Sequence, residues 1–139
     1  MADPDDEIVL EWVEQIPDPD RLFMRVPVGW LPAGILHPGV FREIEGAISV
    51  DWEKYTTAQQ TRDRARNPSK TGVVALVAGE VRAVDGLSVQ HEPIRPNRSH
   101  SGIHGLSSSQ ALPPEESKTR RRSELFALIG EEGWEISPY

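Results

Sequence analysis

The chain has 139 residues, no cysteine and a formal net charge of −7, from 15 basic and 22 acidic side chains. This length fits one domain with a single hydrophobic core. The absence of cysteine excludes a disulfide framework, a thiolate zinc site and a cysteine nucleophile. The acidic balance disfavours general nucleic-acid binding, because such a surface needs an excess of Lys and Arg.

The N-terminal region does not resemble an export signal. The first 20 residues carry eight acids and no base, the reverse of the basic start of a signal peptide. The longest apolar run, 73–78, has six residues, whereas a membrane span needs about 20. We therefore expect a soluble cytoplasmic protein without a membrane partner.

The expected organisation is a single domain. It covers residues 1–139 in four parts: a disordered start (1–6), a core (7–105), a linker (106–114) and a C-terminal helix with a tail (115–139). Near the start, apolar residues recur at helical spacing from Ile8 to Ile16, which predicts a short helix that ends before Pro17.

Five segments are expected to form strands. Apolar and polar residues alternate in 22–26 and 48–52, which is a strand pattern. The uninterrupted apolar run 73–78 is typical of a strand buried on both faces. Asp85-Gly86 predicts a hairpin turn that joins an extended segment at 81–84 to a strand at 87–91. A last short strand is expected at 101–104.

Two further helices are expected. The capping-box sequence 57–60 predicts a helix to about residue 66, whose Arg62, Arg64 and Arg66 we expect in solvent. A C-terminal helix is expected to start at Pro113 or Pro114 and to end at Gly130, with 118–122 projecting into solvent. Together these elements indicate an α+β fold, a small and mostly antiparallel sheet with two or three peripheral helices.

Three histidines raise the question of a metal site. His91, His100 and His104 could supply three imidazoles to a catalytic type of zinc site. Gly102 lies between His100 and His104 and Gly105 follows them, however, and no H-E-x-x-H sequence orients the pair. We expect polar loop or strand-end histidines and no metal.

The strongest candidate for an anion site is an acid-free interval of 22 residues, 93–114. It contains Arg95, Arg98, His100 and His104, and guanidinium and imidazole groups beside loop amides suit a phosphate or a carboxylate. The alternative is that a loop of low complexity simply lacks charged residues.

A second candidate consists of Arg25 in the first expected strand and Arg42 after the following loop. The order LFMRVP followed by GVFR faintly resembles mono-ADP-ribosyltransferase and RES-type toxin domains. The resemblance implies a nucleotide ligand, with Tyr55 as the aromatic for nicotinamide and Glu80 or Glu92 as the acid. The alternative is that these arginines pair with surface acids.

A broader resemblance covers residues 22–105. The order of short segments in this region, which ends in NRSHSGIHG at 97–105, is similar to that of a family of small uncharacterised bacterial proteins. Members of this family have an N-x-x-H-x-x-I-x-G ending. It implies a bacterial cytoplasmic protein and marks His100 for testing.

Two functions from different classes remain open. The first is a binding or interaction module, with a protein partner, in a multi-protein system. The second is an enzyme that acts on a nucleotide or another phosphate-bearing ligand, with Arg25 and Arg42 holding the anion and His100 as the candidate catalytic acid–base. No cofactor is indicated. The decision between them depends on whether Arg25 and His100 share one cleft.

Overall fold

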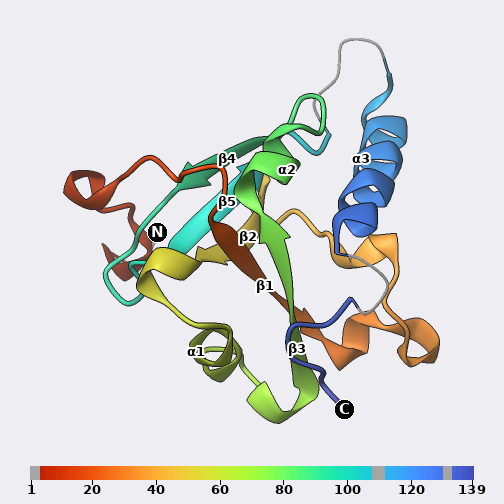
Figure 1. The fold of residues 1–139 in the computed structure, drawn as a ribbon, viewed down its shortest axis with the longest axis horizontal. Coiled ribbons are helices and arrows are strands. Elements are labelled where there is room, and N and C mark those ends of the chain that lie inside the picture. The colour runs from red at the N-terminus through yellow and green to blue at the C-terminus, as the bar shows by residue number, and fades with distance from the viewer. Residues whose placement is uncertain (1–3, 108–111, 130–132) are drawn as a thin grey trace.

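The computed structural model describes residues 4–107, 112–129 and 133–139. Its centre is a five-stranded sheet in the order β3-β1-β2-β5-β4, in which all neighbouring strands are antiparallel (Figure 1). The strands are β1 (Arg21–Pro27), β2 (Ala47–Trp52), β3 (Thr71–Val77), β4 (Ser88–His91) and β5 (His100–His104). The α+β prediction with an antiparallel sheet is confirmed.

Three α-helices accompany the sheet in the described residues: α1 (Ala58–Asp63), α2 (Ala78–Arg82) and α3 (Pro114–Leu128). The predicted capping box is present, because the Thr57 hydroxyl accepts from the Gln60 amide and the Gln60 side chain accepts from the Thr57 amide. Short 3-10 turns form at Pro4–Asp6, Leu10–Trp12, Val28–Trp30, Pro32–Gly34, Pro38–Val40, Glu53–Tyr55 and Pro68–Lys70.

The two faces of the sheet have different covers. Along β1, Leu22, Met24 and Val26 point into the core, which also takes in Leu125 of α3. Phe23 points to the opposite face. Asp51 lies directly opposite Phe23 in the β1–β2 register and therefore shares that face. Because the Thr61 hydroxyl of α1 donates to Asp51, α1 covers this second face.

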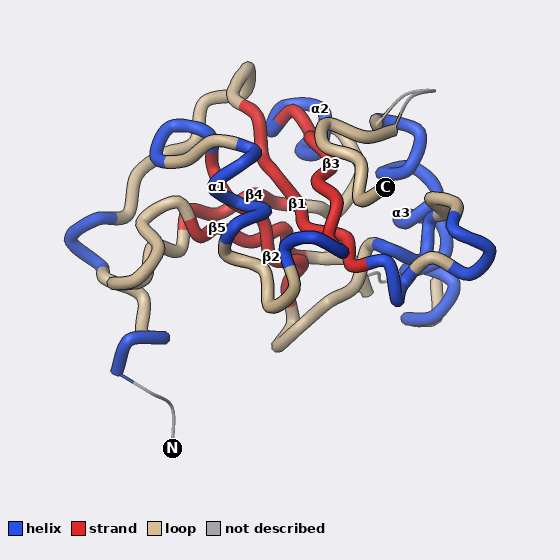
Figure 2. Tube along the Cα trace, turned by 90° about the horizontal axis from the view of Figure 1, so that it is seen from below, coloured by secondary structure: helices blue, strands red, loops and turns tan. Residues whose placement is uncertain are grey.

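The expected core residues are buried. Val74 and Leu76 of β3 are 0% and 1% exposed, and Val89 of β4 is 9% exposed. β3 is nevertheless the outermost strand on its side of the sheet. The C-terminal segment runs along its free edge, where Ile136 bridges Val73 (Figures 1 and 2). This contact shields an edge that would otherwise be open to pairing with another chain.

Two local predictions were wrong. The segment predicted to be extended at 81–84 contains the last two residues of α2 and the turn that follows it, so Asp85-Gly86 leads from a helix to β4 and does not close a hairpin. Gly86 does have a positive φ of 83°, so the predicted turn chemistry is present. The helix predicted near the N-terminus is replaced by 3-10 turns and irregular chain, with Val9 and Ile16 buried.

The C-terminal helix also differs from expectation in its middle part. The segment 118–122 was expected in solvent, but Arg121 is 8% exposed. Its guanidinium donates to the carbonyls of Asp85, at 2.9 Å, and of Gly105. Arg122 donates to the Phe41 carbonyl at 2.8 Å. Both arginines therefore fasten α3 to the rest of the fold. The helix end expected at Gly130 and residues 108–111 of the expected linker lie outside the described residues.

No helix within the described residues has the length and apolar composition that crossing a lipid bilayer requires.

Candidate functional site

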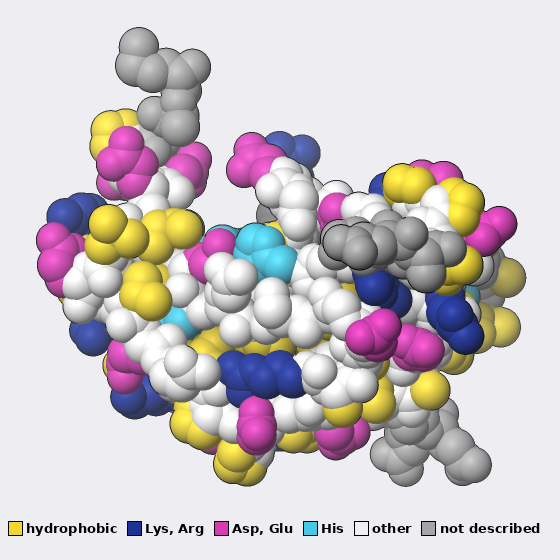
Figure 3. Space-filling model, turned by 90° about the horizontal axis from the view of Figure 1, so that it is seen from above, with side chains coloured by type: hydrophobic (Ala, Val, Ile, Leu, Met, Phe, Trp, Pro, Cys, Tyr) yellow, Lys and Arg dark blue, Asp and Glu magenta, His cyan; other side chains and the backbone are white. Residues whose placement is uncertain are grey.

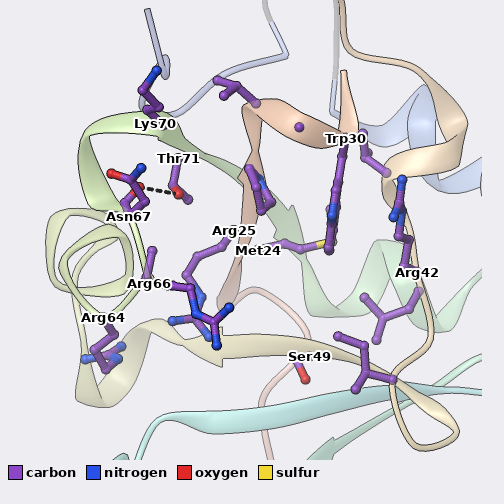
Figure 4. A pocket seen from close by; sticks show the side chains of 17 residues that line it. Met24, Arg25, Trp30, Arg42, Ser49, Arg64, Arg66, Asn67, Lys70 and Thr71 are labelled. Atoms are coloured by element: carbon purple, nitrogen blue, oxygen red, sulfur yellow. Dashed lines mark hydrogen bonds between the residues drawn. The ribbon is translucent and has the colours of Figure 1, made fainter. Parts of the chain in front are cut away.

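A pocket opens where β1 and β2 separate. β1 pairs with β3 over seven residue pairs, and β2 pairs with β5 over five. Between β1 and β2, only Leu22–Trp52 and Phe23–Asp51 are paired. Beyond Phe23 the two strands diverge, and a pocket of about 570 Å³ lies at this divergence, lined by residues from 24–30, 40–49 and 64–71 (Figure 4).

The charged side chains that line this pocket are all basic. β1 contributes Arg25, the loop before β2 contributes Arg42, and the segment between α1 and β3 contributes Arg64, Arg66 and Lys70. No Asp, Glu or His is among the described lining residues. In a chain with a net charge of −7, this pocket is therefore a local concentration of positive charge.

Two of the five cations are engaged within the fold. Arg64 forms an ion pair with Asp51 at 2.8 Å, and Asp51 is 3% exposed. The Arg42 guanidinium lies over the Trp30 ring, 4.4 Å from its centroid. The side chains of Arg25, Arg66 and Lys70 make no hydrogen bond or ion pair with the described parts of the chain. These three cations are free to meet an anion.

The ion pair of Arg64 belongs to a network that fixes one wall of the pocket. Asp51 also accepts from the Thr61 hydroxyl and from the Asn97 amide, each at 2.9 Å. Asn97 in turn accepts from the Ser99 backbone amide at 3.1 Å. The start of the N-x-x-H-x-x-I-x-G sequence thus ties the loop before β5 to β2 and α1.

Arg95, Arg98 and His91 lie elsewhere, in a group we call the aromatic cluster: Trp12, Trp52, Tyr55, His91, Arg95 and Arg98. Arg98 lies over Tyr55 at 4.7 Å and over Trp12 at 5.1 Å, measured to the ring centroids. Arg95 lies 6.0 Å from the Trp12 ring. These contacts hold the N-terminal segment against the sheet.

His91 of the aromatic cluster is 4% exposed and has both ring nitrogens engaged. The Glu14 amide donates to Nδ1 at 3.0 Å, so Nε2 carries the proton and donates to the Arg98 carbonyl at 2.7 Å. The Glu14 carboxylate receives hydrogen bonds from Lys54 and Tyr55, which lower its pKa below the usual glutamate range. The His91 ring and the Glu14 carboxylate are therefore both engaged in hydrogen bonds within the fold.

His100 and His104 form a third location, at Glu92. His100 Nδ1 lies 2.9 Å from the Glu92 carbonyl, and His104 Nε2 lies 3.1 Å from the Glu92 carboxylate. Gly102, between the two histidines in β5, leaves room for this carboxylate, because a Cβ there would meet it at 2.1 Å. The described residues include no group of three His, Asp or Glu side chains arranged to hold a metal ion.

The sequence-predicted site residues are therefore divided among three places. Arg25 and Arg42 share the pocket, whereas His100 is not among its lining residues. The ligand role of each residue stays a prediction. The sequence-based prediction of the site did not include three lining cations, Arg64, Arg66 and Lys70. The expectation that Arg64 and Arg66 are exposed is confirmed. A signal was available, because the pocket is built largely from two acid-free intervals, 21–42 and 64–79.

No family model, no curated protein and no solved structure matches this chain. The function must therefore be inferred from the chemistry of the site itself.

Proposed function

We propose that this protein is a binding module whose pocket between β1 and β2 receives a phosphate-bearing ligand. The observation that carries the proposal is the set of three cations, Arg25, Arg66 and Lys70, that line one pocket without partners in the described chain. Like charges brought together repel one another, and an anionic ligand removes that cost. Arginine and lysine are also the side chains that bind phosphate most often.

Binding is favoured over catalysis because the described residues that line the pocket include no His, Asp or Glu to act as an acid or a base. Its hydroxyls, on Ser49 and Thr71, have no lining His, Asp or Glu to activate them. His100 lies with Glu92, and Tyr55 lies in the aromatic cluster. The groups that an ADP-ribosyltransferase-like reaction would use are thus not gathered around Arg25 and Arg42.

The expected protein partner stays a prediction alongside the pocket. Hydrophobic side chains gather on the surface near the N-terminal end (Figure 3). In that region Ile8, Leu10 and Val13 are 43%, 79% and 45% exposed. Exposed apolar side chains that lie close together are typical of protein contacts. In this proposal the apolar surface would bind the protein partner, and the pocket would bind the phosphate-bearing ligand.

Isothermal titration with inorganic pyrophosphate tests the proposal. Each charge-assisted hydrogen bond is worth about 1.5–3 kcal/mol, so Arg25→Ala combined with Arg66→Ala should weaken binding by roughly 100-fold or more. Arg120→Ala is the matched control, because Arg120 is an exposed arginine on α3 that does not line the pocket. Equal affinity of the wild type and the double variant, or no binding by the wild type, would contradict the proposal.

A further inference from the structure

The pocket has a second chemical character besides its charge. Trp30 is the only aromatic among the described residues that line it, and this residue is half-buried. In Figure 4 the Trp30 ring is seen edge-on, with Arg42 against one face and the pocket interior, toward Arg25, on the other. The Cζ atom of Arg42 lies 4.4 Å from the centroid of the ring, and this contact holds the ring in its orientation. One face of the indole is therefore held in place and turned toward the space that a ligand would fill.

The polar and apolar parts of the pocket are separated in space. The Arg25 and Arg66 side chains converge on the side of the segment between α1 and β3, whereas Trp30 lies across the cavity with Met24 beside it (Figure 4). Lys70 also lines the pocket, but its side chain points away from these two guanidinium groups. A ligand that fills both sides needs a flat, largely apolar ring at one end and a negative group at the other. The volume of about 570 Å³ falls within the range of small-molecule sites.

We propose that the ligand is a mononucleotide, with its base stacked on Trp30 and its phosphates bound by Arg25 and Arg66. This inference rests on the proposed function and specifies the ligand class for the same pocket. Bases stack on aromatic side chains whatever their sequence, because every base has a π-face. A guanidinium binds phosphate oxygens through two parallel N–H donors.

A single nucleotide fits the charge distribution better than a strand of nucleic acid. Arg25 and Arg66 lie within one pocket, and the whole chain has a net charge of −7. Each further phosphate of a strand would leave the pocket and meet an acidic protein. The affinity should therefore not grow with the number of nucleotides.

The test compares adenosine diphosphate, adenosine and inorganic pyrophosphate by isothermal titration. We expect adenosine diphosphate to bind about 10-fold or more tightly than pyrophosphate, since base stacking adds to the phosphate contacts. Trp30→Leu should remove this advantage, measured as the ratio of the two affinities in the same protein. Trp30→Phe keeps a stacking surface and should restore most of the advantage. In the wild type, nuclear Overhauser effects should connect base protons with the Trp30 indole, which does not depend on any variant folding.

The outcomes separate this inference from the proposed function. If pyrophosphate binds as tightly as adenosine diphosphate and no indole contact is seen, the nucleotide inference is overturned and the anion pocket stands. If neither ligand binds, both fail. Tighter binding of a short single-stranded oligonucleotide than of adenosine diphosphate would overturn the restriction to mononucleotides.

Discussion

The pocket and the aromatic cluster both combine arginine with aromatic rings, yet they differ in what the arginines already contact. Arg98 in the cluster lies over two rings, and its carbonyl accepts from His91. Arg25 in the pocket has no hydrogen bond or ion pair within the described chain. The sequence shows where the arginines are along the chain. The contacts that each arginine makes in the fold decide whether it is available to bind a ligand.

The largest expected effect concerns Asp51, which connects the pocket wall to the loop before β5. Asp51→Ala leaves the donors of Arg64, Thr61 and Asn97 without their acceptor in a site where Asp51 is 3% exposed. Because Arg64 keeps some access to water, we expect a loss near the lower end for a buried pair, about 3 kcal/mol of unfolding free energy. Urea denaturation measures it. A loss below about 1 kcal/mol would mean that the network contributes no more than a surface ion pair.

A crossed pair of substitutions tests the difference between the two regions directly. Arg98→Ala should lower the unfolding free energy by about 0.5–2 kcal/mol, the range for cation–π contacts, and leave pyrophosphate affinity unchanged. Arg25→Ala should do the opposite, with weaker binding and a stability change within about 0.5 kcal/mol. The same two proteins serve for denaturation and titration. If Arg98→Ala weakens pyrophosphate binding more than Arg25→Ala does, the regions have been assigned the wrong way round.

The smallest expected effect is a pH dependence of stability at Glu14, which accepts a hydrogen bond from Tyr55 of the aromatic cluster. The pKa of Glu14 is lowered in the fold by hydrogen bonds from Lys54 and Tyr55. Its contribution to stability is therefore fully present above the ordinary glutamate pKa of about 4.3 and is lost as the pH falls through the lower folded value. Melting temperatures of the wild type and Glu14→Gln should converge as the pH falls through this window. A constant difference between the two proteins would show that Glu14 ionisation does not stabilise the fold.

The strands could be predicted from the sequence because their signal is local. Leu22, Met24 and Val26 recur at every second position, and that period places all three on the face of β1 that packs in the core. The segment around Val81 could not be predicted in the same way. A short apolar stretch fits either a strand or a helix, and in this fold Val81 is buried from within α2.

The candidate site was only half predictable. Arg25 and Arg42 were found as basic residues near an expected strand, but Arg66 and Lys70 reach the pocket only because β1 and β2 separate after Phe23. No local pattern encodes that separation. The burial of Arg121 was also not predictable from a local pattern, because the carbonyls that it binds are distant in sequence.

The most direct test is a crystal structure of the protein with pyrophosphate. An anion bound between Arg25 and Arg66, with oxygen atoms about 2.7–2.9 Å from their nitrogen atoms, is the predicted result. Density for pyrophosphate at Arg98 and His100, with the pocket between β1 and β2 empty, would contradict the account.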